Sequence, residues 1–170
     1  VFQTFFQHAA STVASKGVSI ALPLSAAGLS RATFIDELLE QLERSPLPPR
    51  LLHLVIPANV LMQESDKAIP AIQILRQAGC RIVLSQVNRD LALFDCLSAH
   101  MADYLLLDSE LCASLHGNLM DEMLVSIIQS HAQRLGVRTI AGPVQMPLIM
   151  DALSGIGIDL IYGDVIADAQ

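Results

Sequence analysis

The sequence predicts an α/β protein in which parallel strands alternate with helices. Strand-like and helix-like segments alternate six times along the 170 residues, at a spacing of roughly 30 residues that is typical of β–α–β units. Hydrophobic residues make up 52% of the chain and charged residues only 16%, as expected when strands are buried on both faces. An open doubly wound sheet or a (β/α)-barrel would both satisfy this alternation.

The first part of the chain is expected to supply two helices and a strand between them. Residues 2–16 carry apolar side chains at helical spacing, and Gly17 stands where the helix would end. A strand follows over residues 18–24, and Pro23 should stop its pairing because proline has no backbone donor. Ser30 is expected to cap the next helix. The predicted apolar side of that helix is Phe34, Ile35, Leu38, Leu39 and Leu42.

The alternation continues to the end of the chain. Further strands are predicted over residues 51–56, 81–87, 104–108, 138–144 and 160–166. The intervening helices are predicted over residues 65–78, 90–99, 118–134 and 145–154. The strongest helix, 118–134, is expected to bury Leu119, Met123, Leu124, Ile127, Ile128, His131 and Leu135.

Composition excludes several classes of function. The formal net charge is −7 and lysine occurs only at positions 16 and 67, so no surface for nucleic acid is expected. The apolar runs fall short of the ~20 residues of a membrane helix, so this segment is expected not to contact a membrane. Cys80, Cys96 and Cys112 fit neither a disulfide framework nor a metal clip. We expect them to be reduced core residues in a cytoplasmic compartment.

Six runs of the sequence resemble, in order and spacing, motifs of the EAL domain, the cyclic di-GMP phosphodiesterase fold of bacterial signalling proteins. The runs are IALPLSA (20–26), LHLVIPANVLM (52–62), AGCRIVLSQVNRD (78–90), ADYLLLDSEL (102–111), LGVRTIAGPVQ (135–145) and GIDLIYGDVIADAQ (157–170). They are similar to the family's VAVNLSA, LELEITESxLM, LGVRIALDDFGTG, VDxLKIDRSF, LGLxVVAEGVE and GCDxxQGYLFSRP. The resemblance implies a (β/α)-barrel of TIM type.

The likeness covers the C-terminal two-thirds of the family's domain. The family's opening strand and helix, with the Glu-Ala-Leu motif, have no counterpart here. Residues 1–170 are therefore expected to form a single EAL-like domain that is incomplete at its N-terminus and belongs to a longer parent. The resemblance implies a cytoplasmic domain, often following a GGDEF domain, in some cases behind an inner-membrane sensor.

The family's chemistry is expected to be absent. The resemblance implies metal ions held by carboxylate and amide oxygens at the strand ends, where they activate water. The matching positions here are Pro23 for the Asn, Val55 for the first Glu, Ser85 and Gln86 for the Asp pair, Leu106 for the Lys, Gly142 for the later Glu and Tyr162 for the Gln. Only Asp108 matches a family carboxylate. We therefore assign no catalytic, cofactor-binding or metal-binding residue, and we expect no cofactor.

Two segments have both a functional and a plainer interpretation. Asp108 would either coordinate a lone cation or a ligand amide, or simply cap the next helix, which is the favoured interpretation. Asn88, Arg89 and Asp90 would form either a partner-binding loop or an ordinary polar turn, the latter favoured.

The predicted function is that of a catalytically inactive regulatory domain in cyclic di-GMP signalling. It would act through a protein partner or self-association. The alternative is a receptor that binds cyclic di-GMP without cleaving it, and an active phosphodiesterase is the least favoured hypothesis.

Overall fold

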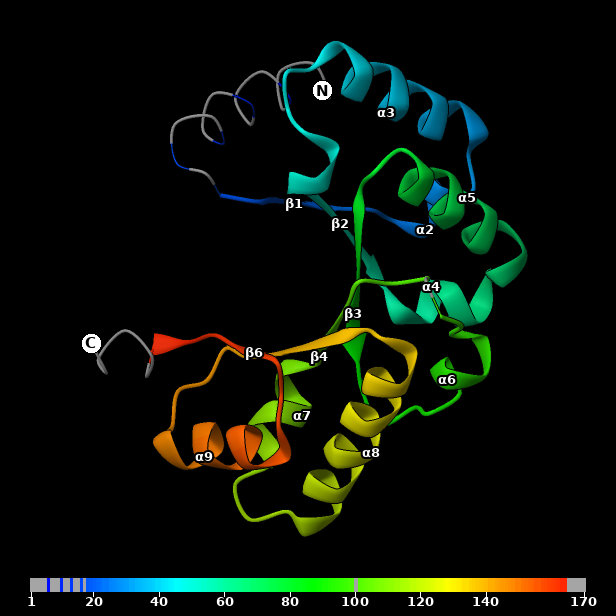
Figure 1. Ribbon diagram of the computed structural model, residues 1–170. Helices are drawn as coiled ribbons and strands as arrows, with labels where there is room; N and C mark the ends of the chain where they lie inside the picture. Colours follow the sequence, from blue (N-terminus) through cyan, green and yellow to red (C-terminus); the bar gives the residue numbers. More distant parts are fainter. Residues whose placement is uncertain are drawn as a thin grey trace. The chain divides into compact units, whose positions relative to one another are not determined.

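The computed structural model describes residues 6, 10, 13, 16, 18–99 and 101–164 (Figure 1). The chain forms two compact units, Val1–Val83 and Leu84–Gln170. Most of the helix predicted over residues 2–16, and its end at Gly17, lie outside the described residues. Of the residues described there, Phe6, Ala10 and Val13 are helical and buried.

The first unit contains two parallel strands, β1 (Ile20–Pro23) and β2 (Leu52–Pro57). Their register places Ile20 opposite Leu52 and Pro23 opposite Val55. The last strand residue of β1 is Pro23, as its missing N–H predicts. On β2 alternate side chains are fully buried, namely Leu52, Leu54 and Ile56. The expected strands are therefore present, each shifted by one or two residues from its predicted bounds.

Helices α2 (Ala26–Leu29), α3 (Ala32–Arg44) and α5 (Ser65–Gln77) pack against one another in this unit (Figure 1). Two further short elements flank β2: η1 (Pro49–Leu51) and α4 (Ala58–Gln63). The predicted core side of α3 is confirmed at Ile35, Leu38 and Leu42, which are buried, while Phe34 and Leu39 are half-buried. A helix of about one turn carries too few residues for a 3.6-residue period, so α2 and α4 were not predicted.

The predicted helix cap at Ser30 is wrong. Ser25 is the capping serine, because its hydroxyl accepts a hydrogen bond from the Gly28 N–H at 3.2 Å and begins α2. Ser30 instead ends α2, and its hydroxyl donates to Glu64 Oε2 at 2.6 Å. The following helix α3 begins after Arg31, which makes no side-chain capping bond. Because α2 was not predicted, the start of the following helix was predicted one residue too early.

Strand β3 (Arg81–Val87) has the predicted bounds and crosses from the first unit into the second. The second unit then carries β4 (Tyr104–Leu107), β5 (Arg138–Ala141) and β6 (Leu160–Ile161). These three pair in parallel, with Leu106 opposite Ile140 and Ile140 opposite Leu160. Of the predicted strand 160–166, residues 165 and 166 lie outside the described residues. The helices of this unit are α6 (Leu93–Cys96), α7 (Ser109–Ser114), α8 (Leu119–Leu135) and α9 (Pro147–Ile156).

The predicted buried face of α8 is confirmed at Ile128, is half-buried at Leu124, His131 and Leu135, and is wrong at three other positions. Leu119, Met123 and Ile127 are exposed by 68%, 54% and 51%. The residues that are buried are Asp121, Val125, Ile128, Gln129 and Ala132. Two of these are polar, and hydrogen-bond partners inside the unit make their burial favourable. The helix is therefore rotated away from the orientation that hydrophobicity alone would select.

The three cysteines are free, as expected. Burial raises the pKa of the Cys80 thiol to about 11 and also raises the pKa of Cys112. Both thiols are therefore protonated at neutral pH and behave as small apolar core residues. Cys96 is half-buried. Within the described residues, no helix combines the length and the apolar character needed to span a bilayer.

Candidate functional site at the strand ends

In the first unit, the structure brings together the two positions where the resemblance implies metal ligands. Pro23 and Val55 are direct partners at the carboxyl ends of β1 and β2. The backbone N–H of Leu24 donates to the Val55 carbonyl at 2.8 Å, which extends the pairing by one bond. Neither the Pro23 ring nor the Val55 side chain has an atom that binds a hard cation. This pair therefore offers only apolar surface.

In the second unit, Ser85 and Gln86 are adjacent near the end of β3 but lie in different environments. Ser85 is buried, with 9% exposure, and Gln86 is exposed. Gln86 has φ of +58°, a left-handed conformation in which a side chain is disfavoured. Among the described residues it is the only one other than glycine with positive φ. Such strain costs about 1–3 kcal/mol and is commonly found at functional sites.

Asp108 follows β4 and caps α7. Its Oδ1 accepts the Glu110 N–H at 2.9 Å, and its own N–H donates to the Val87 carbonyl at 2.8 Å. The negative carboxylate also suits the positive end of the helix dipole. Leu106, two residues earlier, presents a half-buried aliphatic side chain. The one retained carboxylate is thus used in local structure.

The segment after β5 and the segment after β6 lie so close together that a side chain would not fit at Gly142 or at Gly163. A Cβ atom at Gly142, whose φ is +147°, would lie 2.3 Å from the Tyr162 carbonyl oxygen. A Cβ atom at Gly163, also at φ +147°, would lie 2.2 Å from the Val144 backbone nitrogen. The approach is fixed by hydrogen bonds from Val144 N–H to the Tyr162 carbonyl (2.8 Å) and from Tyr162 N–H to the Ala141 carbonyl (3.1 Å). Only glycine fits at position 142 in this arrangement.

The loop of Asn88, Arg89 and Asp90 is ordered by hydrogen bonds within the second unit. The Asn88 Oδ1 accepts the Asp90 N–H at 2.9 Å, and the Asp90 Oδ1 accepts the Ala92 N–H at 3.0 Å. Arg89 makes a bidentate pair with Asp121, from Nε to Oδ1 at 2.9 Å and from Nη2 to Oδ2 at 2.8 Å. The Arg89 side chain is 52% exposed and that of Asp121 only 6%.

Asp121 is the acceptor at the centre of this network. Its Oδ2 also accepts from the Ser114 hydroxyl at 2.6 Å and from the Asn118 amide at 2.7 Å. The hydrogen bonds from Arg89 and then Ser114 hold the pKa of the Asp121 carboxyl below its usual range, against the effect of desolvation. The network ties the loop after β3 to the start of α8.

Replacing Arg89 by alanine is expected to lower the melting temperature more than replacing the neighbouring Asp90. The reason is that Asp121 would keep its buried carboxylate but lose its cation. Because the Asp121 pKa is depressed, its stabilising effect is complete above the unfolded-state value and is lost as the pH falls through the folded-state value. The Arg89→Ala variant should therefore lose less stability than the wild-type chain as the pH falls below 3.8. Thermal unfolding at several pH values in this range measures the difference. Equal melting temperatures for Arg89→Ala and Asp90→Ala would contradict this role.

Comparison with known sequences identifies the family. The sequence model of the EAL domain matches residues 1–169. The chain belongs to the EAL family. It is 69% identical over 170 residues to the probable diguanylate cyclase DgcE of Escherichia coli (strain K12), covering all of this chain and 15% of that protein. It is 24% identical over 144 residues to the cyclic di-GMP phosphodiesterase NbdA of Pseudomonas aeruginosa, covering 85% of this chain and 18% of that protein. The chain thus spans less than a fifth of the length of these relatives.

Solved EAL structures confirm the predicted fold. The EAL domain of FimX from Xanthomonas citri, in complex with c-diGMP, matches with a TM-score of 0.86 at 20% identity, over 97% of this chain and 66% of that one. The PaMucR phosphodiesterase, in complex with c-di-GMP, matches with a TM-score of 0.82 at 20% identity, over 95% of this chain and 66% of that one. The α/β fold of the EAL barrel type, with strands alternating with helices, is therefore the fold of this chain.

The EAL resemblance implies metal ligands at several of the positions described above. Among the residues that the structure describes, no group of three or more His, Cys, Asp or Glu side chains is placed to hold a metal. Pro23, Val55, Leu106 and Gly142 have no side-chain donor atom, and Asp108 already caps α7.

A second polar network in this EAL domain was not predicted from the sequence. Thr139 on β5 is fully buried, and its hydroxyl lies 2.5 Å from Gln129 Oε1 and 3.0 Å from Asp159 Oδ2. The Thr139 N–H donates to Asp159 Oδ2 at 2.8 Å, and Gln129 Nε2 donates to the Gly157 carbonyl at 2.7 Å. The one available signal is Gln129 itself, a polar residue one position after two isoleucines of α8. The network joins α8, β5 and the segment before β6.

Proposed function

We propose that this EAL domain does not hydrolyse cyclic di-GMP and instead regulates a cyclic di-GMP signalling protein through contact with a protein partner or a second copy of itself. The observation that carries the proposal is the contact between Gly142 and Tyr162. The family's later glutamate corresponds to Gly142, and a Cβ there would lie 2.3 Å from a backbone oxygen. The backbone around this position is thus arranged for a residue with no side chain.

Other positions at which the resemblance implies site residues support the same proposal. Hydrolysis of a phosphodiester by metal-activated water needs several oxygen ligands around the cations. Pro23 and Val55 face each other as an apolar pair, and Leu106 stands where the family has lysine. Asp108 is the one retained carboxylate, and it already accepts a backbone hydrogen bond from Glu110. A single carboxylate does not assemble a two-metal site.

The relatives support the signalling context. The relative with 69% identity is named a probable diguanylate cyclase, and it is far longer than this chain. We propose that residues 1–170 constitute a single EAL domain of a longer parent that also carries a GGDEF domain. We further propose that this domain works in the cytoplasm, in a parent anchored to the inner membrane.

A non-hydrolysing receptor for cyclic di-GMP is the second candidate. It is favoured by the likeness to the FimX EAL domain, whose structure contains c-diGMP. Against it, phosphate groups are best held by charge-assisted hydrogen bonds from arginine or lysine. Arg89, the cation nearest in sequence to Gln86, donates to the Asp121 carboxylate and so is already paired.

Calorimetric titration of the chain with cyclic di-GMP, with and without Mg²⁺ or Mn²⁺, tests the proposal. We expect no binding heat and no linear product in either condition. Binding without metal and without product would favour the receptor. Metal-dependent binding followed by linear product would overturn the proposed loss of catalysis.

A further inference from the structure

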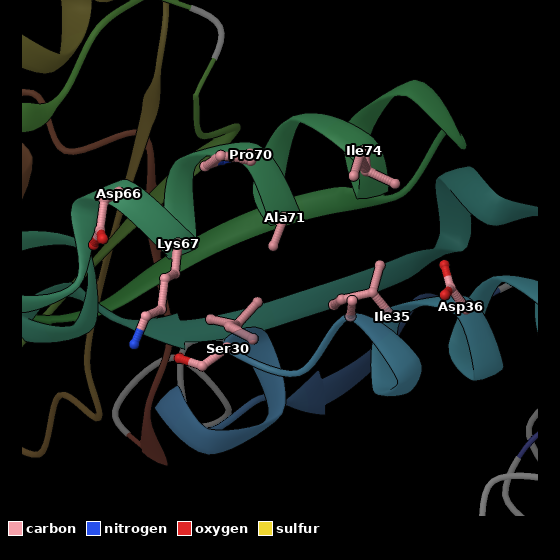
Figure 2. Close-up of a pocket in the computed structure, with 10 residues that line it drawn as sticks. Ser30, Ile35, Asp36, Asp66, Lys67, Pro70, Ala71 and Ile74 are labelled. Atoms are coloured by element: carbon pink, nitrogen blue, oxygen red, sulfur yellow. The ribbon is translucent and has the colours of Figure 1, made fainter.

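The first unit has a groove between its outer helices that is separate from the strand-end positions. It lies where α5 passes α2 and α3, and it encloses about 260 Å³ (Figure 2). Its apolar lining has a buried part, formed by Leu29, Ile35 and Ala71, and an exposed part, formed by Ala32, Pro70 and Ile74. Ile74 is 45% exposed. The exposed part is apolar surface that an occupant could bury.

The rim of the groove is acidic. Figure 2 shows Asp66, Lys67 and Ser30 near one end and Asp36 near the other, with Ile35, Ala71 and Ile74 between them. The Lys67 ammonium is 3.8 Å from Glu64 Oε2, the same oxygen that accepts the Ser30 hydroxyl. The lining residues carry two carboxylates, Asp36 and Asp66, and one ammonium, and the Glu64 carboxylate beside Lys67 offsets that ammonium. Within the described residues, neither Asp36 nor Asp66 forms an ion pair.

We propose that this groove binds a basic amphipathic helix of a partner protein. An apolar side chain of the partner would cover Pro70 and Ile74, and lysine or arginine residues would meet Asp66 and Asp36. Asp66 and Ile74 are eight residues apart on α5, or about 12 Å along its axis. A partner helix of two or more turns would span this length, with an apolar residue against Ile74 and basic residues beside it that reach the carboxylates. The inference rests on the proposed function, since it gives the protein-binding role a location.

The test uses a synthetic peptide as the probe. It is a helical peptide of about 16 residues, with lysine at positions i and i+7 and leucine at i+3 and i+4. Its binding to the full chain is measured by fluorescence anisotropy. The variant Ile74→Lys should weaken binding by about tenfold or more, because it removes apolar contact and adds a like charge. Asp36→Asn and Asp66→Asn should each weaken it by about two- to fivefold and reduce its salt dependence.

A matched control is available in the second unit. Ile127 on α8 is 51% exposed, close to the 45% of Ile74, so Ile127→Lys introduces the same change at an equally exposed site. It should leave peptide binding unchanged. Absence of binding by the wild-type chain, or equal weakening by both isoleucine variants, would overturn the proposal. Equally tight binding of a short aliphatic amine would also overturn it, by showing a small-molecule site.

The same protein samples separate the two proposals. Titration with cyclic di-GMP and metal, with analysis for linear product, reports on the strand-end positions alone. Product formation with intact peptide binding would overturn the proposed loss of catalysis and leave the groove proposal in place. Absence of both product and peptide binding would overturn the groove proposal alone.

Discussion

Replacing Gly142 by alanine is expected to destabilise the chain by more than about 3 kcal/mol, or to prevent folding. A Cβ at this position would lie 2.3 Å from the Tyr162 carbonyl oxygen, and the φ of +147° is one that side chains rarely adopt. The opposing group is backbone fixed by the hydrogen bond to Val144, so it has little freedom to move. Chemical denaturation followed by circular dichroism measures the change. Gly142→Glu, which restores the family's residue, should be at least as destabilising and should gain no hydrolytic activity.

Two other glycines serve as controls for this prediction. Gly117 has φ of +87° but no atom within 4 Å of the added Cβ, so its alanine variant should lose only about 1 kcal/mol. Gly155 lies inside α9 with open space around it, and alanine there should stabilise by about 0.5–1 kcal/mol. If Gly142→Ala were as stable as Gly155→Ala, the close approach of the two segments would be wrong. The main support for the proposed function would then be lost.

Thr139→Val is expected to destabilise the second unit by about 2–3 kcal/mol. Valine has nearly the shape of threonine but removes the hydroxyl that joins Gln129, Asp159 and β5. The Gln129 Oε1 and the Asp159 N–H would then be left without this partner. Thr139→Ser keeps the hydroxyl and loses one methyl group, so it should cost only about 1 kcal/mol. Equal unfolding free energies for the two variants, measured in urea, would contradict the importance of the network.

The same network predicts an acid-sensitive contribution to stability. Burial raises the pKa of Asp159, but hydrogen bonds from the Thr139 N–H, the Thr139 hydroxyl and Gln129 outweigh it and hold the pKa below the usual value of 3.8. The unfolded chain therefore binds more protons than the folded chain just below that pH. The stabilisation is complete above pH 3.8 and is lost as the pH falls through the folded-state value. Thr139→Val should show a weaker pH dependence in this range, because it lacks one of the three donors.

Local patterns were sufficient to place most of the long elements. β3 occupies the predicted residues, because its apolar run is bounded by Gly79 and by polar Asn88. α5 and α8 also agree with prediction within about two residues, since glycine or polar residues mark their ends. The family followed from six ordered motifs, each of which depends only on neighbouring residues. The capping role favoured for Asp108 is in line with the hydrogen bond that its Oδ1 accepts from the Glu110 N–H.

The face of α8 could not be predicted in the same way. Leu119, Met123 and Ile127 are apolar and helically spaced, so periodicity assigns them to the core, yet they are exposed. The orientation is decided by Arg89 and Thr139, which lie 32 and 10 residues from the buried Asp121 and Gln129 that they contact. No local pattern encodes which distant partner will satisfy a buried polar group.

The sequence by itself determined the alternation of strands and helices, the EAL family and the identity of the residues at the strand ends. It determined these because period, turn chemistry and motif order are properties of short segments. Only the tertiary structure decided that position 142 has no room for a side chain, that Arg89 is paired with Asp121, and that α3 and α5 enclose an acidic groove. These features depend on distances between segments that are far apart in the chain, and such distances exist only after the backbone has folded.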